Sequence, residues 1–353
     1  MDFSQIEGLN RLRGPILITG HTGFKGTWLT LLLEHLEIEC VGFSLEPESN
    51  SLFDRAGRKG ALPESFEDIR DFAKVEKMLK IYRPAAVIHM AAQPLVLDSY
   101  KTPRETFETN VMGTANILDA SFNSQSVEAI IVVTTDKVYK NQELGNHFIE
   151  SDALSGKDPY SASKVGTESA VSAWQQISKV LGGPKVVSVR AGNVIGGGDW
   201  AQSRLLPDLI RGFEGKKRIE IRNPESTRPW QHVLDPLTGY LGALNEALNG
   251  KEVYAFNFGP SGKSLTVREV AELASSTWGH VEGIDFKQTS LEQNHEAINL
   301  SLDSSHARNT LNWNSNWSQP DSVIATVEWW KNVIEGGASP SQACLKDIDI
   351  LKK

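Results

Sequence analysis

A tyrosine and a lysine four positions apart, Tyr160 and Lys164, form the spacing in this sequence that most directly suggests chemistry. Side chains four apart on a helix share one face, so the ammonium can lie beside the phenol. A free tyrosine has a pKa of about 10, and a neighbouring cation is needed to make it a useful base near neutrality. Of the six tyrosines, only Tyr160 has a lysine at the fourth position after it. We interpret the pair as a general base with its supporting cation, against the alternative of a chance spacing.

An acid and a base stand side by side at Asp136 and Lys137, where the apolar run 130–134 ends. Polar residues at the carboxyl end of a strand point into the crevice where doubly wound proteins bind their ligands. Adjacent opposite charges at such a position bring no evident structural advantage. We interpret Thr134, Thr135, Asp136 and Lys137 as part of a site, and the alternative is a solvated pair at the end of a strand.

Three glycines spaced by three residues, Gly20, Gly23 and Gly26, follow the apolar run 16–19 and open a helical segment. Glycines in this arrangement allow a tight turn and a close approach of the backbone to a pyrophosphate. The helix N-terminus adds free N–H groups and the positive end of its dipole. The turn therefore predicts dinucleotide binding, and the alternative is an ordinary turn, which also collects glycine.

The choice between NAD and NADP depends on weaker signals. The second apolar run is followed by Ser44 and ends without an acidic residue that could hold the adenosine ribose. Arg55, Arg58 and Lys59 in the next loop could in principle face the 2′-phosphate of NADP. Asp68 is a plausible contact for the adenine, with a solvated loop acid as its alternative. We expect NAD, and NADP stays open.

These residues need a scaffold, and the first half of the chain supplies a regular one. Five apolar runs rich in β-branched residues alternate with helical segments, at residues 16–19, 40–43, 87–91, 130–134 and 186–190. They are apolar throughout, as expected of strands buried on both faces of a parallel sheet. The order predicts an α/β fold with a Rossmann-type doubly wound sheet. A further buried strand is expected at 254–258.

Helix start signals place the site residues on this scaffold. Asp158 followed by Pro159 is typical of a helix N-terminus, just before Tyr160. Residues 102–105 and 266–269 have the pattern of capping boxes. The helix that carries Lys164 has a face of small residues, which permits close approach of another helix, either within the chain or in a second copy.

The regular pattern ends after residue 190, where a glycine-rich segment leads into shorter elements. We expect a dinucleotide-binding domain over residues 1–192, with a returning segment near 230–260. A smaller α/β substrate-binding lobe is expected from residues 193–229 and 261–353. At 353 residues, the chain has room for about two such units.

Composition excludes several classes of protein. The chain has 36 Lys and Arg against 44 Asp and Glu, a net charge of −8, which disfavours sequence-independent nucleic-acid binding. No apolar run approaches the roughly 20 residues of a membrane span, and the N-terminus does not have the pattern of a signal peptide. The two cysteines, Cys40 and Cys344, are far apart, and the eight histidines show no metal-ligand spacing. We expect a cytoplasmic protein without a metal site.

Five longer segments, together with the Tyr160–Lys164 pair, resemble the extended short-chain dehydrogenase/reductase superfamily and, within it, the family of CDP-glucose 4,6-dehydratases. The segments are residues 19–29, 89–96, 109–114, 190–200 and 222–240, and the similarity runs from about residue 14 to about residue 335. The resemblance implies a nucleotide-sugar substrate, CDP-glucose, and a tightly bound NAD. It also implies loss of water to give a 4-keto-6-deoxy sugar without net oxidation, in a homodimer or a dimer of dimers.

The resemblance implies roles for the residues of the motifs. Tyr160, supported by Lys164, takes the proton of the hydroxyl on carbon 4, to which Thr135 is hydrogen-bonded. Asp136 protonates the leaving hydroxyl on carbon 6. Lys137 stands where most related dehydratases have a glutamate, and it is expected to take the proton from carbon 5, which requires a neutral amine.

Contacts with the two ligands are also implied by the resemblance. Those expected for NAD are Gly20, Thr22, Gly23, Phe24, Gly26, Ser44, Asp68, Ile69, Ala91, Ala92, Gln93, Asn110, Thr134, Tyr160 and Lys164. Those expected for the nucleotide sugar are Asn193, Arg204, Arg228 and His295. Other readings stay open: a dehydratase of another nucleotide sugar, a nucleotide-sugar 4-epimerase, or a catalytically silent NAD-binding regulator.

Overall fold

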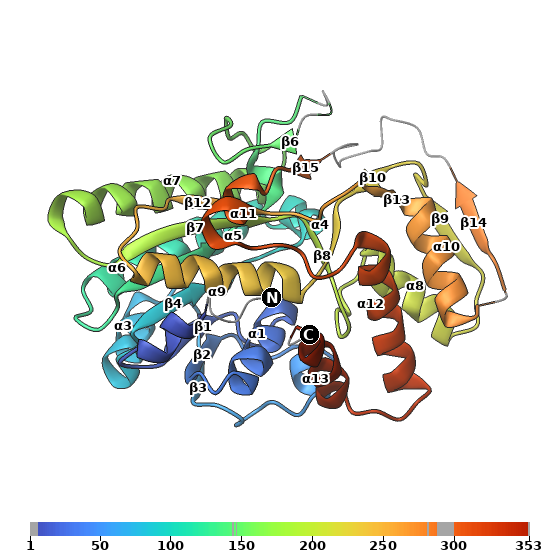
Figure 1. Ribbon diagram of the computed structural model, residues 1–353, viewed down its shortest axis with the longest axis horizontal. Helices are drawn as coiled ribbons and strands as arrows, with labels where there is room; N and C mark the ends of the chain where they lie inside the picture. The colour runs from blue at the N-terminus through green and yellow to red at the C-terminus, as the bar shows by residue number, and fades with distance from the viewer. Residues whose placement is uncertain (1–5, 143–144, 146, 281, 288–299, 352–353) are drawn as a thin grey trace.

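A seven-stranded parallel sheet forms the centre of the larger part of the protein (Figure 1). The computed structural model describes residues 6–142, 145, 147–280, 282–287 and 300–351. The strand order is β12-β7-β5-β4-β1-β2-β3, and every pairing is parallel. The strands are β1 (Ile16–Thr19), β2 (Cys40–Ser44), β3 (Glu64–Phe66), β4 (Ala86–His89), β5 (Ala129–Val133), β7 (Lys185–Ala191) and β12 (Ala255–Phe258). The reversal of order between β1 and β4 confirms the doubly wound α/β fold.

Helices cover both faces of the sheet, which explains why its strands are apolar throughout. The covering helices are α1 (Phe24–His35), α3 (Phe72–Tyr82), α6 (Gly113–Phe122), α7 (Pro159–Leu181) and α9 (Leu234–Leu248). Leu17, Val87 and Ile130 belong to one buried cluster with residues of α3, α6 and α7. Ile16 and Ile18 belong to the other, with residues of α1 and α9. Successive strand residues thus pack into opposite cores.

The expected strands are confirmed to within two residues at each end. The structure adds β3, which the sequence does not announce as a strand, because its three residues are only partly buried and two of them are polar. Two helix signals are confirmed: Asp158 caps α7, and Thr266 caps α10 (Val267–Trp278), each in a capping box. The expected capping box at Thr102 is wrong. Its hydroxyl donates to the carbonyl of Asp98 instead, because α4 (Val96–Lys101) ends there.

A smaller lobe lies beside the carboxyl ends of the strands (Figure 1). It is built from α8 (Leu205–Glu214), α10, α12 (Gln319–Ile334) and the paired strands β9 (Ile219–Arg222) and β14 (Ile284–Lys287). The segment expected to form the end of this lobe is divided. Helix α11 (Ser305–Leu311) packs on α9 and β12, and α13 (Pro340–Ile350) packs on α1. Helix α13 also packs on α12 of the lobe, so only α11 lies wholly against the sheet domain, and the expected domain boundaries stay a prediction.

The small-residue face of α7 is partly used within the chain. A Cβ at Gly166 would lie 2.8 Å from Val111 Cγ2, in the short π-helical segment Glu108–Met112. Close helix packing inside the subunit therefore accounts for that glycine. Among the described residues, no helix is both long and apolar enough to cross a bilayer.

Candidate active site

The glycine turn between β1 and α1 contains two glycines that the fold requires and one that has open space beside it. Gly20 has a φ of +74°, and a Cβ there would lie 2.8 Å from the backbone nitrogen of Ala91. A Cβ at Gly26 would overlap the Gly20 carbonyl oxygen. Gly23 instead meets only that oxygen, at 3.3 Å, and caps the N-terminus of α1. The turn thus leaves open the middle position, where a pyrophosphate approaches the backbone, so these residues fit a dinucleotide.

The end of β2 is tied to this turn. The Thr22 and Ser44 hydroxyls hydrogen-bond at 2.7 Å, and Thr22 also reaches the Leu45 carbonyl. Asp68, beyond β3, accepts the Arg70 guanidinium at 2.6 Å, which holds the pKa of that carboxyl below its usual range. Asp68 is therefore fixed in position by its neighbour.

The three cations that could have faced a 2′-phosphate are each engaged elsewhere. Arg55 stacks on an indole, Arg58 is nearly buried in an ion pair, and Lys59 is in an exposed ion pair. The partners are Trp200 for Arg55, Glu34 for Arg58 and Glu46 for Lys59. Their engagement favours NAD over NADP at this end of the sheet.

Three residues expected to contact the cofactor turn their side chains to protein instead. Ile69 is 4% exposed and packs against Gly113. Thr134 donates its hydroxyl to Glu168 at 2.5 Å. Asn110 uses both amide hydrogens within the protein, on the Gln93 carbonyl at 3.0 Å and on a hydroxyl of α7 at 2.9 Å. These side chains are therefore held by protein partners in this structure, and their contact with the cofactor stays a prediction.

The segment after β4 remains suitable for lining a cofactor. Ala91, Ala92 and Gln93 are partly exposed at the carboxyl end of that strand. The Gln93 backbone N–H is held by Asn110 at 2.8 Å, and its side chain closes a turn on Leu95. Phe24, at the start of α1, is also partly exposed. The small side chains and the fixed backbone leave this edge of the sheet open to a flat ligand.

The start of α7 brings Tyr160 and Lys164 to the carboxyl end of β5. Both side chains are nearly buried, at 8% and 5% exposure. The Lys164 ammonium donates to the Val133 carbonyl at 3.2 Å, and the Thr135 hydroxyl is a hydrogen-bonding neighbour of the Tyr160 phenol. The two residues from α7 thus meet the residues that follow β5, as the sequence predicted.

Asp136 is the most unusual group in this cluster. It is 1% exposed, and its Oδ1 accepts the Thr135 hydroxyl at 3.0 Å. Its Oδ2 has no hydrogen-bond partner among the described residues. Burial raises the pKa of the Asp136 carboxyl, against the opposing charges of Lys137 and Arg228. A buried carboxyl that favours its protonated form and has one oxygen unengaged is suited to donate a proton to a ligand.

Lys137 stands beside this carboxyl in the short helical turn Asp136–Val138. Its side chain is only partly buried, and its backbone N–H donates to the Thr135 hydroxyl at 3.3 Å. The turn therefore presents an acid and an amine at adjacent positions, both held by one threonine.

Burial also acts on the tyrosine and lysine of α7. It raises the pKa of Tyr160 to about 12 and lowers the pKa of Lys164 to about 8. The Thr135 hydroxyl opposes the first shift, and the Glu168 carboxylate opposes the second. Tyr160 therefore needs positive charge beside it before it can accept a proton near neutrality.

Three of the four expected substrate contacts gather around these groups. Asn193 begins β8 (Asn193–Ile195), next to Gly192, where a Cβ would lie 2.9 Å from Asp136 Oδ2. Arg228 and Arg204 lie close enough to act electrostatically on Asp136 and on the tyrosine of α7 respectively. Arg204 also pairs with an aspartate at 2.9 Å. His295 lies outside the described residues.

The sequence analysis missed Lys25, which lies inside the glycine turn. Its ammonium donates to the Tyr240 hydroxyl at 3.4 Å and is close enough to be affected by Lys164, Arg204 and Asp136. Burial lowers the pKa of Lys25 to about 7. The signal in the sequence is a charged residue between the second and third glycines, at the start of a buried helix. In the described part of the chain, no cluster of three or more His, Cys, Asp or Glu is arranged to hold a metal ion.

Comparisons with known proteins agree with this geometry. The model of the NAD dependent epimerase/dehydratase family matches residues 16–259. The CDP-glucose 4,6-dehydratase of Salmonella typhimurium is 38% identical over 330 residues, which cover 91% of each chain. The UDP-glucose 4-epimerase of Rhizobium leguminosarum is 25% identical over 334 residues, covering 89% of this chain and 96% of that one.

Solved structures share the fold at lower identity. A UDP-glucose 4-epimerase of Stenotrophomonas maltophila with bound NAD superposes with a TM-score of 0.80 at 20% identity, covering 92% of this chain and 100% of that one. A dTDP-glucose 4,6-dehydratase of Bacillus anthracis in complex with NAD gives a TM-score of 0.77 at 20% identity, with 93% and 99% covered.

Proposed function

We propose that CDP-glucose is the substrate of this chain, which belongs to the NAD dependent epimerase/dehydratase family and, within it, to the NAD-dependent nucleotide-sugar 4,6-dehydratases. The proposed reaction removes water from the glucosyl unit and leaves a 4-keto-6-deoxy sugar. The observation that carries the proposal is Asp136, a buried carboxyl with one unengaged oxygen beside Lys137 and Tyr160. An epimerase, which only inverts carbon 4, has no use for an acid and an amine at these positions.

NAD fits the open side of the glycine turn, with Gly23 at the N-terminus of α1 and Ala91 to Gln93 along the opposite wall. When bound, NAD would supply a temporary hydride acceptor: the hydride taken from carbon 4 leaves a ketone there and is returned to carbon 6, with a proton to carbon 5, so that the cofactor ends the cycle oxidised. The residues of the chain supply the proton transfers.

The first proton transfer belongs to Tyr160. The Thr135 hydroxyl and the phenol lie together, so both can contact the hydroxyl on carbon 4. Tyr160 takes its proton, and the charged Lys164 favours the phenolate form. The Lys164 ammonium is fixed to the Val133 carbonyl, and the cation therefore stays in place during the transfer.

Elimination follows from the pair after β5. A ketone on carbon 4 acidifies the proton on carbon 5, and we assign the removal of that proton to Lys137. Asp136 gives its proton to the hydroxyl on carbon 6 as the carbon–oxygen bond breaks, and water leaves. The raised pKa of Asp136 favours the protonated carboxyl that this step requires.

The substrate's pyrophosphate needs local cations, because the chain as a whole is acidic, with a net charge of −8. We propose Arg228 for this role, with Asn193 and Arg204 as further contacts, since all three surround the acid and the tyrosine. A guanidinium suits a pyrophosphate because it can donate two parallel hydrogen bonds.

Incubation with CDP-, dTDP-, UDP- and GDP-glucose in the presence of NAD, followed by mass spectrometry, tests the proposed substrate. We expect loss of one water from CDP-glucose at the highest rate. Loss from dTDP-glucose but not from CDP-glucose would refute the choice of nucleotide and leave the reaction standing. Inversion at carbon 4 without a change in mass would refute the reaction itself.

Gly23→Ala should weaken NAD binding without unfolding the protein. The backbone at Gly23 has φ −74°, which alanine adopts, and its only close neighbour is a carbonyl oxygen at 3.3 Å. The added methyl group would stand on the side where the pyrophosphate approaches. We expect the Kd for NAD, measured by calorimetry, to rise at least about tenfold, equivalent to about 1.4 kcal/mol. Gly26→Ala is the contrast, since its Cβ overlaps the Gly20 carbonyl and should lower the Tm instead.

A homodimer is part of the proposal. Apolar side chains on α4 and on the adjoining helix α5 (Pro103–Phe107) are exposed in the subunit, with Leu97 at 53%, Tyr100 at 47% and Phe107 at 41%. Patches of this kind mark protein–protein contacts more often than free surface. Light scattering should therefore give twice the mass of the chain or a multiple of that, and a monomer at micromolar concentration would contradict the proposal.

A further inference from the structure

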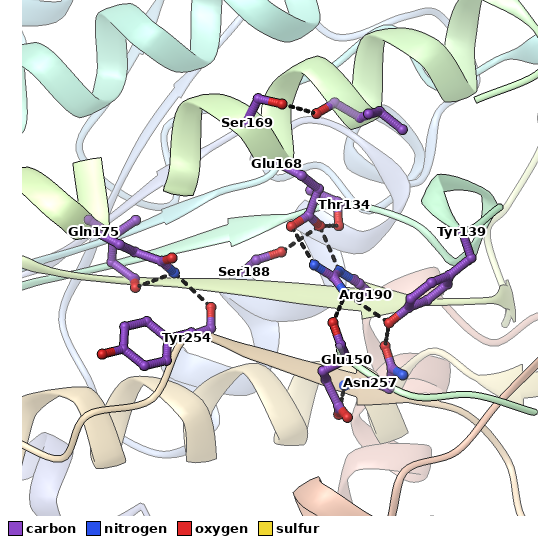
Figure 2. A network of polar contacts seen from close by, with 12 residues as sticks. Thr134, Tyr139, Glu150, Glu168, Ser169, Gln175, Ser188, Arg190, Tyr254 and Asn257 are labelled. Atoms are coloured by element: carbon purple, nitrogen blue, oxygen red, sulfur yellow. Dashed lines mark hydrogen bonds and ion pairs between the residues drawn. The ribbon is translucent and has the colours of Figure 1, made fainter. Parts of the chain in front are cut away.

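A buried ion pair behind the active site has no part in the proton transfers described above. Glu168 on α7 and Arg190 on β7 are 2.8 Å apart and only 5% and 6% exposed (Figure 2). The Glu168 carboxylate also accepts the hydroxyls of Thr134 at 2.5 Å and Ser188 at 2.6 Å. Burying such a pair rarely stabilises a fold more than apolar side chains of the same size would. Stability of the fold alone therefore does not account for the pair.

The position of Glu168 relative to Lys164 supplies one. The two residues lie one helical turn apart on the buried face of α7. Lys164 donates to the carbonyl of Val133, and Glu168 accepts the hydroxyl of Thr134, the next residue along the chain. The helix therefore holds two consecutive residues at the end of β5, immediately before the segment that carries Asp136.

Arg190 extends this hold to the other side of the catalytic turn. Its guanidinium donates to the Tyr139 hydroxyl at 2.8 Å and to the Glu150 carbonyl at 3.0 Å (Figure 2). The Tyr139 hydroxyl donates in turn to Asn257 on β12 at 2.7 Å. Contacts to Thr134 and Tyr139 thus fix the chain just before and just after the acid and the amine.

The same carboxylate affects the charge of Lys164. Burial lowers the pKa of Lys164 to about 8, and Glu168 is the group that opposes this shift. The ammonium also faces other ionisable groups from the elements packed around it. These are Lys25 on α1 and His89 on β4. Burial lowers the pKa of His89 to about 3, so that imidazole is neutral and supplies no charge near neutral pH.

We propose that Glu168 is a positioning residue for the reaction, which fixes the end of β5 against the catalytic helix and keeps the Lys164 ammonium charged. The inference rests on the roles given to Tyr160 and Lys164 under the proposed function. It distinguishes Glu168 from an ordinary structural acid, because a structural acid would affect stability and not the titration of the active site.

The variants Glu168→Gln and Glu168→Asp separate charge from shape. Glutamine keeps the size but removes the negative charge, so Lys164 should lose its proton at a lower pH. We expect the alkaline limb of the kcat profile to move down by about one pH unit, with kcat reduced about twofold at pH 7 and up to about tenfold above pH 8, and KM changed less than about twofold. Aspartate keeps the charge and should leave the limb in place. Ser188→Ala, which removes one hydrogen bond to the same carboxylate, is the matched control and should not move it either.

An unmoved limb in a folded Glu168→Gln protein would overturn the inference, as would an equal shift in both Glu168 variants. An unpaired Arg190 could unfold the single variant, and the double variant Glu168→Gln with Arg190→Gln then removes both charges together. Profiles are measured with the nucleotide glucose that the unmodified protein dehydrates. NMR titration of the lysine ammonium groups in the NAD-loaded protein, with the Lys164 signal assigned from its loss in Lys164→Arg, follows its protonation without any substrate. Failure of CDP-glucose as substrate therefore stays distinguishable from failure of the role of Glu168.

Discussion

Asp136→Asn should stop the loss of water while leaving the oxidation at carbon 4 in place. The amide keeps the size of the carboxyl but has no acidic proton to give to the leaving hydroxyl. Removal of a general acid costs about 10²–10⁴-fold, and we expect a fall of this size in the rate of dehydration. The oxidation, which depends on Tyr160 and Lys164, should still be seen as the absorbance of the bound reduced cofactor in a single turnover.

Lys137→Met is the companion variant that separates the acid from the base. It should also abolish dehydration, but it should in addition remove the exchange of the proton on carbon 5 with deuterated solvent. Asp136→Asn should retain that exchange, because its base is intact. Normal dehydration by either variant would show that the residues after β5 do not carry the elimination.

Tyr160→Phe should abolish the reaction at its first step. The phenol is nearly buried and lies near Thr135 and Asp136, and phenylalanine keeps the ring while removing the group that takes the proton. We expect kcat to fall by at least about 10²–10⁴-fold, and neither reduced cofactor nor exchange at carbon 5 should appear.

The matched control for this change is Tyr139→Phe, a second nearly buried tyrosine whose hydroxyl belongs to the Arg190 network. It should weaken stability by about 1–3 kcal/mol, because its hydroxyl makes two hydrogen bonds, while still allowing oxidation. Oxidation at the normal rate by Tyr160→Phe would assign the base elsewhere, and Lys25 would be the first residue to test.

The main features of the fold could be predicted from the sequence because they depend on local patterns. Apolar runs mark the strands buried on both faces, and the tyrosine and lysine of α7 share a face through helical periodicity alone. Asp136 follows directly on a strand, so its place at the edge of the sheet follows from the strand itself.

Other features depend on contacts between residues far apart in the chain. Glu168 lies 34 residues from Thr134, and Lys25 lies 215 residues from Tyr240, so neither pairing leaves a trace in a local pattern. Thr102 has the pattern of a capping box, but a carbonyl of the preceding helix takes its hydroxyl. The partner of the Thr102 hydroxyl is therefore decided by the folded backbone and not by the local sequence pattern.

The expected cofactor contacts show the same limit. A motif indicates which segments approach the ligand but not where each side chain points. Asn110 and Thr134 lie in the right segments, yet hydrogen bonds to other elements use their polar groups. Among the glycines of the turn, only Gly23 has packing around it that leaves one side open to a cofactor.

The most direct test of the account uses CDP-glucose carrying deuterium on carbon 4, with the unmodified protein and NAD. Oxidation at carbon 4, elimination of water and reduction at carbon 6 in one site should give a product that is lighter by one water and carries the deuterium on carbon 6. A product of unchanged composition with the deuterium still on carbon 4 would contradict the account and show that the chain is an epimerase.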